Sequence, residues 1–156
     1  MISVENGALA DLVVISGSEA EHVAMQEYER LLRPAAERGL PCFCTNPDIH
    51  KLIGGSIAPG AGSIARLYEE LGGSVRWLGK PHREIYDYAL ALVDRSDLKR
   101  VICIGDSIEH DIAGAAGASL DSVLVETGVQ SLLTREHRLG TEHSLRPTSR
   151  MTRFSR

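Results

Sequence analysis

The most informative segment of the sequence is residues 101–111, which read VICIGDSIEHD. Its first four residues are apolar on both faces of an extended chain, which is typical of a central strand in a parallel sheet. Gly105 and Asp106 follow at once, so Asp106 is expected at the carboxyl end of that strand. Asp111 comes five residues later, near the first turn of the next helix. Because ligands of open α/β sheets bind beyond the carboxyl ends of the strands, this segment is where we expect chemistry.

Strands and helices alternate on both sides of this segment. Strands are expected at 11–16, 42–45, 74–78, 101–104 and 122–125, and helices at 19–38, 63–71, 82–95 and from 111 onward. Strands separated by helices of this length predict an α/β protein with a parallel sheet and right-handed crossovers.

Details of three segments are also predicted. Residues 46–60 read as a polar loop, and Ser63 is a candidate cap for the helix that follows it. The apolar spacing of the helix at 82–95 predicts that one face is buried, formed by Ile85, Ala89, Leu92 and Val93.

A second strand end carries a lysine. Gly79-Lys80-Pro81 follows the apolar run at 74–78. The glycine allows a turn, proline suits a helix start, and the lysine offers a compact positive charge to a phosphate or carboxylate. On the sequence alone, a lysine in a turn is more often simply solvated. We expect Lys80 and Asp106 at the ends of consecutive strands, one crossover apart.

Two carboxylates, Asp106 and Asp111, could converge on one hard cation across the strand-to-helix turn. Magnesium takes oxygen ligands and commonly uses one or two protein carboxylates, with water and substrate phosphate completing its shell. The alternative is that Asp111 only caps the helix and interacts with its positive end. Both roles are compatible.

Composition limits the classes of function. The 156 residues are 43% hydrophobic and 24% charged, with a net charge of −4, which fits one ordinary globular domain and argues against non-specific nucleic-acid binding. No apolar run is long enough to span a bilayer, so no membrane partner is expected. No secretory signal is recognised at the N-terminus. Cys42, Cys44 and Cys103 lie in apolar runs and are expected as buried core thiols, which favours a cytoplasmic location over a disulfide framework.

Four motifs occur in an order that resembles the class IIA phosphatases of the haloacid dehalogenase (HAD)-like hydrolase superfamily. They are Thr45-Asn46-Pro47-Asp48, Gly60-Ala61-Gly62-Ser63-Ile64-Ala65, Gly79-Lys80-Pro81 and Gly105-Asp106 to Asp111, with Thr127-Gly128-Val129 as a further point of similarity. The resemblance covers roughly residues 11–130 and corresponds to the C-terminal portion of such proteins. It implies a HAD-like Rossmannoid fold, a three-layer parallel sheet that is incomplete here. The implied domains are a remnant of the α/β cap at 1–38, the C-terminal part of the core at 39–133 and an irregular basic tail at 134–156.

The resemblance also implies roles for particular residues. Lys80 looks like the lysine that steadies the nucleophile and phosphoryl group, and Asp106 looks like the acidic magnesium ligand, supported by Asp111. The resemblance places Asn46 and Asp48 near the substrate entrance, and Gly105 and Ser107 beside the phosphate. The implied reaction is magnesium-dependent hydrolysis of a small phosphorylated metabolite through an aspartyl-phosphate.

One element of the family pattern is missing. The family's nucleophile lies in an Asp-x-Asp-Gly motif at the end of the first core strand, and no Asp-x-Asp occurs in this sequence. The sequence therefore reads as a truncated hydrolase whose isolated chain is inactive. The alternative is a non-catalytic remnant or a self-associating binding module. An exposed sheet edge or uncovered apolar face would favour a homo-oligomer.

Dinucleotide binding is a third possibility, because residues 60–65 fit Gly-x-Gly-x-x-Ala. That fingerprint normally follows a strand directly, whereas here about fourteen residues intervene after Thr45. No acidic residue closes a second strand at the appropriate distance, so this reading is weak.

Overall fold

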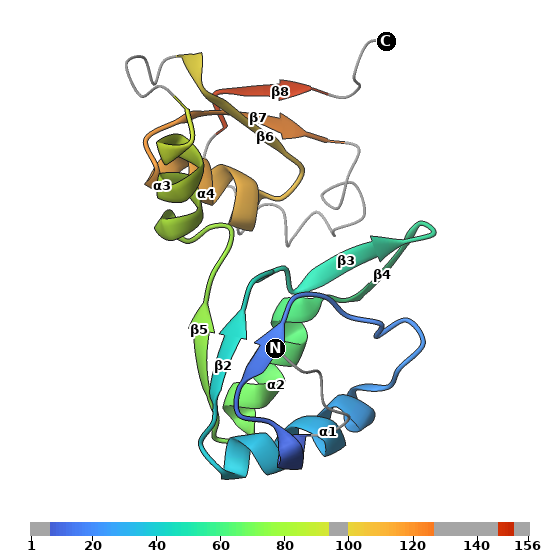
Figure 1. Ribbon diagram of the computed structural model, residues 1–156. Coiled ribbons are helices and arrows are strands. Elements are labelled where there is room, and N and C mark those ends of the chain that lie inside the picture. Colours follow the sequence, from blue (N-terminus) through green and yellow to red (C-terminus); the bar gives the residue numbers. More distant parts are fainter. Residues whose placement is uncertain (1–6, 94–99, 127–146, 152–156) are drawn as a thin grey trace. The chain divides into compact units, whose positions relative to one another are not determined.

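The chain divides into two compact α/β units in the computed structural model, which describes residues 7–93, 100–126 and 147–151 (Figure 1). The first unit comprises residues 1–53 and 58–78, and the second comprises 54–57 and 79–156. The predicted division at residues 38/39 falls inside the first unit, where strands on either side of it pair with each other. The α/β class and the parallel pairing of strands are confirmed.

The first unit has a three-stranded parallel sheet in the order β1-β2-β5. Its elements are η1 (Gly7–Leu9), β1 (Val13–Ile15), α1 (Met25–Glu37), β2 (Pro41–Cys44), β3 (His50–Ile53), α2 (Ala61–Glu70) and β5 (Ser74–Trp77). The strand β4 (Ser56–Pro59) begins in residues assigned to the second unit and ends in the first. Alternate strand residues, including Val13, Ile15, Cys42 and Cys44, face one cluster that also holds the buried residues of α1 and α2.

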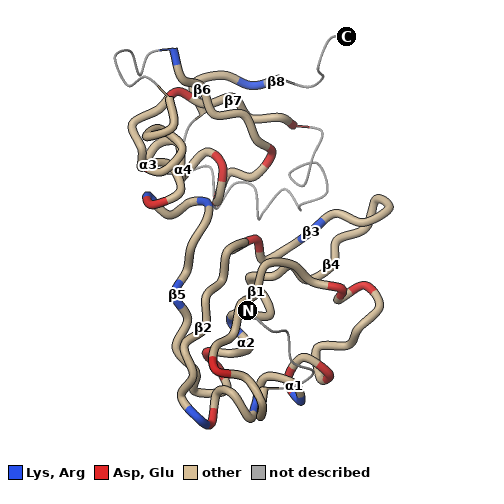
Figure 2. Tube along the Cα trace, viewed as in Figure 1, with Lys and Arg blue, Asp and Glu red and all other residues tan. Residues whose placement is uncertain are grey.

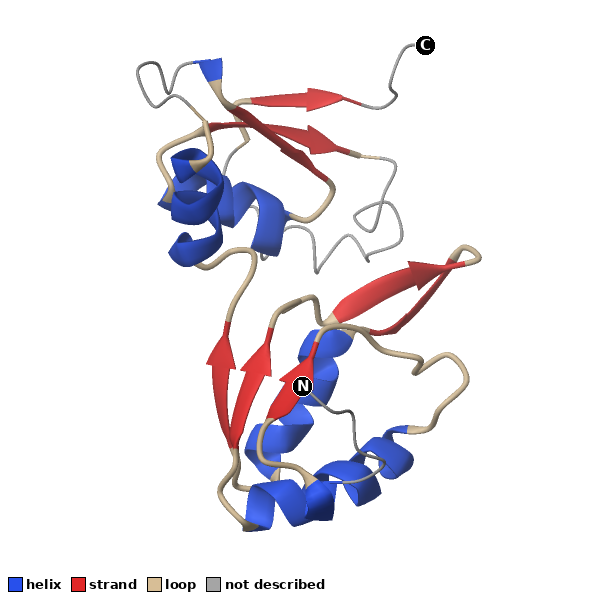
Figure 3. Ribbon diagram, in the orientation of Figure 1, coloured by secondary structure: helices blue, strands red, loops and turns tan. Residues whose placement is uncertain are grey.

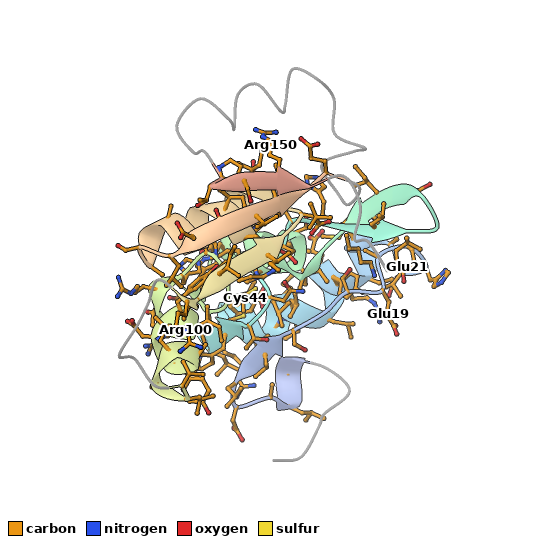
Figure 4. The ribbon with its side chains drawn as sticks, turned by 90° about the horizontal axis from the view of Figure 1, so that it is seen from above. Glu19, Glu21, Cys44, Arg100 and Arg150 are labelled. Atoms are coloured by element: carbon orange, nitrogen blue, oxygen red, sulfur yellow. The ribbon has the colours of Figure 1, made fainter. Side chains whose placement is uncertain are left out.

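Two cysteines lie in this core as predicted. Cys42 and Cys44 are buried, and Figure 4 labels the latter among the packed side chains. Burial raises the pKa of Cys42 to about 12 and also raises the pKa of Cys44 above its ordinary value. Both side chains therefore remain neutral thiols near pH 7.

A β-hairpin occupies part of the segment predicted as a polar loop. β3 and β4 form a two-stranded sheet joined by Gly54 and Gly55, whose φ angles are 55° and 83° (Figure 3). Two consecutive glycines with positive φ are suited to a two-residue hairpin turn, so this signal was present in the sequence. At the hairpin's base, Lys51 pairs with Glu21, which Figure 4 labels on the loop between β1 and α1.

The second unit has its own parallel sheet in the order β6-β7-β8. Its elements are α3 (Arg83–Ala91), β6 (Ile102–Gly105), η3 (Ile108–Ile112), α4 (Ala113–Gly117), β7 (Asp121–Val125) and β8 (Ser149–Met151). α3 and α4 lie side by side on one side of this sheet (Figure 1).

Two packing predictions for this unit are wrong. β6 was expected as a central buried strand, but it lies at the end of the sheet that the described residues form, and Ile102 and Ile104 are each 52% exposed. α3 buries Tyr86 and Leu90 instead of the predicted face, because these two side chains are the ones that meet α4 and β6. The stripe predicted to be buried is exposed at Ile85, Ala89, Leu92 and Val93.

The tail predicted as irregular contains a strand. β8 pairs in parallel with β7, and Thr148 Oγ1 accepts a hydrogen bond from the Ser122 amide at 3.0 Å. Arg150, labelled in Figure 4, pairs with Glu126 at 3.1 Å. The motif Thr127-Gly128-Val129 and the rest of the tail lie outside the described residues. Within the described ranges no helix is long and apolar enough to cross a bilayer.

Candidate functional site

An ion pair between Lys80 and Asp111 forms the centre of the candidate site. Lys80 lies in the turn after β5, where Gly79 adopts a φ of 85° and its carbonyl accepts a hydrogen bond from the His82 amide at 2.8 Å. The Lys80 Nζ donates to Asp111 Oδ1 at 2.5 Å. The side chain of Lys80 is 47% exposed and that of Asp111 only 7%. The lysine side chain is therefore accessible to solvent, while the carboxylate that it pairs with is buried.

The position of Asp111 is fixed from several directions. Its Oδ2 accepts a hydrogen bond from the Ser107 amide at 3.0 Å, and its own amide donates to the Ser107 carbonyl at 2.9 Å. Gly105 lies against the carboxylate, since a Cβ at that position would stand 2.1 Å from the Asp111 Cγ. Only a glycine fits here without displacing the carboxylate.

Ser107 is the residue that caps the helical segment. Its Oγ accepts a hydrogen bond from the His110 amide at 3.3 Å and lies 2.9 Å from the His110 Nδ1. The tautomer of His110 decides which of the two groups donates in this side-chain contact. Asp111 therefore does not cap this helix, which was one predicted alternative, but is itself held by Ser107.

Asp106 follows β6 directly and is half-buried. Acidic positions mark the end of β6 and the helical segment after it (Figure 2). The expected link between Lys80 and Asp106 through one sheet differs from the structure, because the described residues place β5 and β6 in separate sheets. Lys80 instead reaches this turn by its ion pair with Asp111.

Two acidic groups beside this region, the Tyr86 hydroxyl and the Cys103 thiol, have raised pKa values. Burial, with smaller contributions from Cys103 and Asp111, raises the pKa of Tyr86 to about 12. Burial followed by the charge of Asp111 also raises the pKa of Cys103. A neutral thiol is a poor nucleophile, so Cys103 does not replace the missing carboxylate.

Tyr86 and His110 were not singled out by the sequence. A Cβ on Gly114 would stand 2.0 Å from the Tyr86 hydroxyl oxygen, so this glycine lets α3 and α4 approach closely beside the site. The signal available for His110 was its place three residues after Ser107 in a strand-to-helix turn.

The turn after β6 offers oxygen donors of the kind that a magnesium ion takes. Among the described residues, no group of three or more His, Cys, Asp or Glu side chains could hold a metal. Magnesium requires only one or two protein carboxylates. Asp106 and Asp111 are carboxylates of the kind that magnesium takes, and both oxygens of Asp111 also accept hydrogen bonds. The residue types present thus fit a magnesium ion, and its binding by Asp106 and Asp111 stays a prediction.

Asn46 and Asp48 belong to the first unit, whereas the residues above belong to the second. The Asn46 Oδ1 accepts a hydrogen bond from the Asp48 amide at 3.4 Å, and the Asp48 carbonyl accepts one from the Gly62 amide at 2.9 Å. Their contact with a substrate stays a prediction.

The glycines of residues 60–65 have a structural explanation. A Cβ on Gly60 would stand 2.1 Å from the Asp48 carbonyl oxygen, and one on Gly62 would stand 2.1 Å from that of Pro47. The space that a dinucleotide fingerprint leaves for a pyrophosphate is filled here by the chain's own backbone. Ser63, predicted as the cap of α2, instead donates to the Ile49 carbonyl at 2.7 Å, and Gly60 is the N-cap.

Comparison with known proteins gives concordant matches. The family model described as HAD-hydrolase-like matches residues 77–149. Acid sugar phosphatase of Staphylococcus haemolyticus is 30% identical over 130 residues, covering 77% of this chain and 48% of that protein. The Staphylococcus aureus acid sugar phosphatase is 29% identical over 132 residues, covering 83% and 49%.

Solved structures match over nearly the whole chain. A haloacid dehalogenase-like hydrolase from Brucella suis has a TM-score of 0.76 at 31% identity, covering 96% of this chain and 58% of that one. A p-nitrophenyl phosphatase from Archaeoglobus fulgidus has a TM-score of 0.66 at 31% identity, covering 94% and 55%. The chain spans about half the length of the curated relatives it matches.

Proposed function

Because the chain belongs to the haloacid dehalogenase-like hydrolase superfamily and is similar to phosphatases within it, we propose a role in phosphate-monoester hydrolysis. In this proposal the second unit carries the cationic and metal-binding part of the active site. The observation that carries this proposal is the Lys80–Asp111 ion pair at 2.5 Å beside the end of β6, where Asp106 is placed. The pair holds the exposed ammonium group of Lys80 against the buried carboxylate of Asp111, in the same turn that carries Asp106.

Each residue has a distinct proposed role. Lys80 binds the phosphoryl oxygens, and its charge stabilises the negative charge that develops during transfer. Asp106 binds magnesium, and Asp111 positions Lys80. A bound magnesium ion supplies charge neutralisation at the phosphoryl oxygens. Gly105 and the Ser107 amide hold this turn in shape, and a direct phosphate contact from Ser107 remains part of the proposal.

The isolated chain is proposed to be inactive. Formation of an aspartyl-phosphate requires a carboxylate in line with the phosphorus, and the 156-residue sequence contains no Asp-x-Asp motif. The chain therefore supplies binding groups without a nucleophile of the family type. This makes it a binding module of phosphatase ancestry when it acts alone.

The units and partners follow from the same reasoning. We assign the second unit to the phosphatase core and the first to its cap, which moves the predicted boundary from residue 38 to residue 78. The proposed substrate class is a small phosphorylated metabolite, and the names of the curated relatives favour a sugar phosphate. A second copy of the chain is the proposed protein partner. The free thiols support the proposed cytoplasmic location.

Turnover of p-nitrophenyl phosphate with magnesium tests this proposal. Wild type and Asp106→Asn should both hydrolyse the compound at the rate of buffer alone. In a separate binding assay, the Lys80→Met variant should bind inorganic phosphate more weakly than wild type does. Hydrolysis by wild type that Asp106→Asn abolishes would show a complete active site and overturn the proposed inactivity. Phosphate binding that is unaffected by Lys80→Met would overturn the role of Lys80.

A further inference from the structure

The loop between β1 and α1, residues 16–24, contributes no buried residue to the hydrophobic core. Each of its residues is exposed or half-buried, and none belongs to the cluster that β1, β2, α1 and α2 form. Segments with few buried apolar contacts open at a lower free energy than the core around them. The conformation of this β1–α1 loop therefore depends on its polar contacts.

Lys51 of β3 makes two of these contacts. Its ammonium group donates a hydrogen bond to the Ser18 carbonyl and forms an ion pair with Glu21, and both of these residues lie on the loop. The side chains of Lys51 and Glu21 are only 23% and 21% exposed, whereas those of the Arg30–Glu27 pair on α1 are 74% and 53% exposed. The hydrogen bond from Lys51 lowers the pKa of Glu21 below its ordinary value, so the carboxylate stays charged near neutral pH.

A third contact joins the loop to the other strand of the hairpin. The Ser18 hydroxyl donates a hydrogen bond to the Pro59 carbonyl at 2.5 Å, and Pro59 is the last residue of β4. Ser18 is thus held by β3 through its carbonyl and by β4 through its hydroxyl. The loop is fastened to both strands of the hairpin at one point.

The hairpin is the fixed partner in these contacts. At its base, the Ile49 carbonyl accepts hydrogen bonds from the Gly60 amide at 2.7 Å and from the Ser63 hydroxyl at 2.7 Å, which join the hairpin to the first turn of α2. On the side of α1, the Glu19 amide of the loop donates to the Tyr28 hydroxyl at 2.8 Å. If the contacts with Lys51 break, the loop is therefore the part that moves.

The loop borders the carboxyl edge of the first sheet. It begins directly after β1, and the Thr45 amide at the end of the neighbouring β2 donates a hydrogen bond to the Ile15 carbonyl at 2.9 Å. Asn46, which is predicted to lie near the substrate entrance, comes next in the chain. Ligands of open α/β sheets bind beyond this edge, so a movement of the loop changes the border of the place where a ligand would enter.

We propose that Lys51 is a latch that holds the β1–α1 loop closed on the hairpin, and that loss of its contacts opens the loop while the hairpin and the sheet stay formed. Because one ammonium group holds both Ser18 and Glu21, these two points are released together. The loop then has two states, closed and open, at the carboxyl edge of the first sheet. All the residues of the latch belong to the first unit, so it does not depend on the proposed phosphate site of the second.

Hydrogen exchange of the backbone amides in the full chain tests the latch. Lys51→Met removes the charge and leaves an unbranched side chain of similar length. It should speed the exchange of the loop amides at 18–24 by about tenfold, since hydrogen bonds to charged groups favour the closed state by at least this factor. The amides of β3 and β4 should stay protected. Unchanged exchange in the loop, or an equal increase in β3 and β4, would overturn the proposal.

Charge reversal separates the ion pair from a general loss of packing. Glu21→Lys and Lys51→Glu each bring like charges together and should open the loop, whereas the double variant Glu21→Lys/Lys51→Glu should exchange more slowly than either single variant. Arg30→Met is the matched control, because it removes a solvent-exposed ion pair from α1 and should leave the exchange of the loop unchanged.

Two outcomes of this series would contradict the latch. One is a double variant that exchanges as fast as the single variants, and the other is an effect of Arg30→Met as large as that of Lys51→Met. Phosphate binding by the second unit is a separate readout, so the latch and the proposed function can fail independently.

Discussion

Gly105→Ala should be among the most damaging single-methyl changes in the second unit. The added Cβ would stand 2.1 Å from the Asp111 Cγ and 2.2 Å from its Oδ2, so the buried carboxylate must move. Movement breaks its hydrogen bond from the Ser107 amide, and hydrogen bonds to charged groups are worth about 1.5–3 kcal/mol. The Lys80 pair adds no more than about 1 kcal/mol, because Lys80 is 47% exposed.

Overpacking of a tight site adds about 1–3 kcal/mol, and these contributions overlap, so we expect a loss of about 3 kcal/mol. Urea unfolding followed by circular dichroism should show the midpoint lowered by roughly 1–2 M. Gly117→Ala is the control, since nothing lies within 4 Å of its added Cβ and it occupies the last position of α4. It should change the unfolding free energy by less than about 1 kcal/mol, in the stabilising direction. Equal effects of the two substitutions would refute the close approach of Asp111 to Gly105.

Three further predictions concern single residues. Lys80→Met should lower the unfolding free energy by no more than about 1 kcal/mol, because the ion pair that it removes is exposed at Lys80, and Lys80→Arg should cost less. Urea unfolding of the two variants measures this. Gly62→Ala should disrupt the first unit, since its Cβ would stand 2.1 Å from a backbone carbonyl oxygen. Urea unfolding of this unit can be followed by the fluorescence of Trp77, the single tryptophan, and an unchanged unfolding midpoint would contradict the contact. Burial raises the pKa of Tyr86 to about 12. The folded state therefore keeps a proton that the unfolded state loses above about pH 10, and stability falls from about pH 10 to 12. Tyr86→Phe should fall less steeply, and identical slopes would refute this.

The order of strands and helices could be predicted from sequence because it depends on local periodicity. Along β2 the buried Cys42 and Cys44 alternate with the exposed Pro41 and the half-buried Phe43, as the two-residue period of a strand requires. The ends of β5 and β6 were located by the glycines that follow the apolar runs. These signals are local, so they do not need knowledge of the tertiary fold.

Packing partners were less predictable. Apolar residues of α3 cover more of its surface than its neighbours in the fold bury. Contacts with α4 and β6 bury Tyr86 and Leu90, whereas Leu92 stays exposed. Apolar runs occur both in central strands and in edge strands. The sequence of β6 therefore could not show that this strand lies at the end of the sheet formed by the described residues. The ion pair of Lys80 with Asp111 joins residues 31 apart, and spacing alone could not choose between Asp106 and Asp111.

Binding of magnesium and inorganic phosphate, followed through the backbone amide signals of residues 105–111, measures the proposed site most directly. Phosphate added in the presence of magnesium should shift these signals in the wild-type chain, and Asp106→Asn should remove the magnesium dependence. Signals that stay in place, or shift identically in wild type and Asp106→Asn, would contradict a phosphate and metal site at the end of β6.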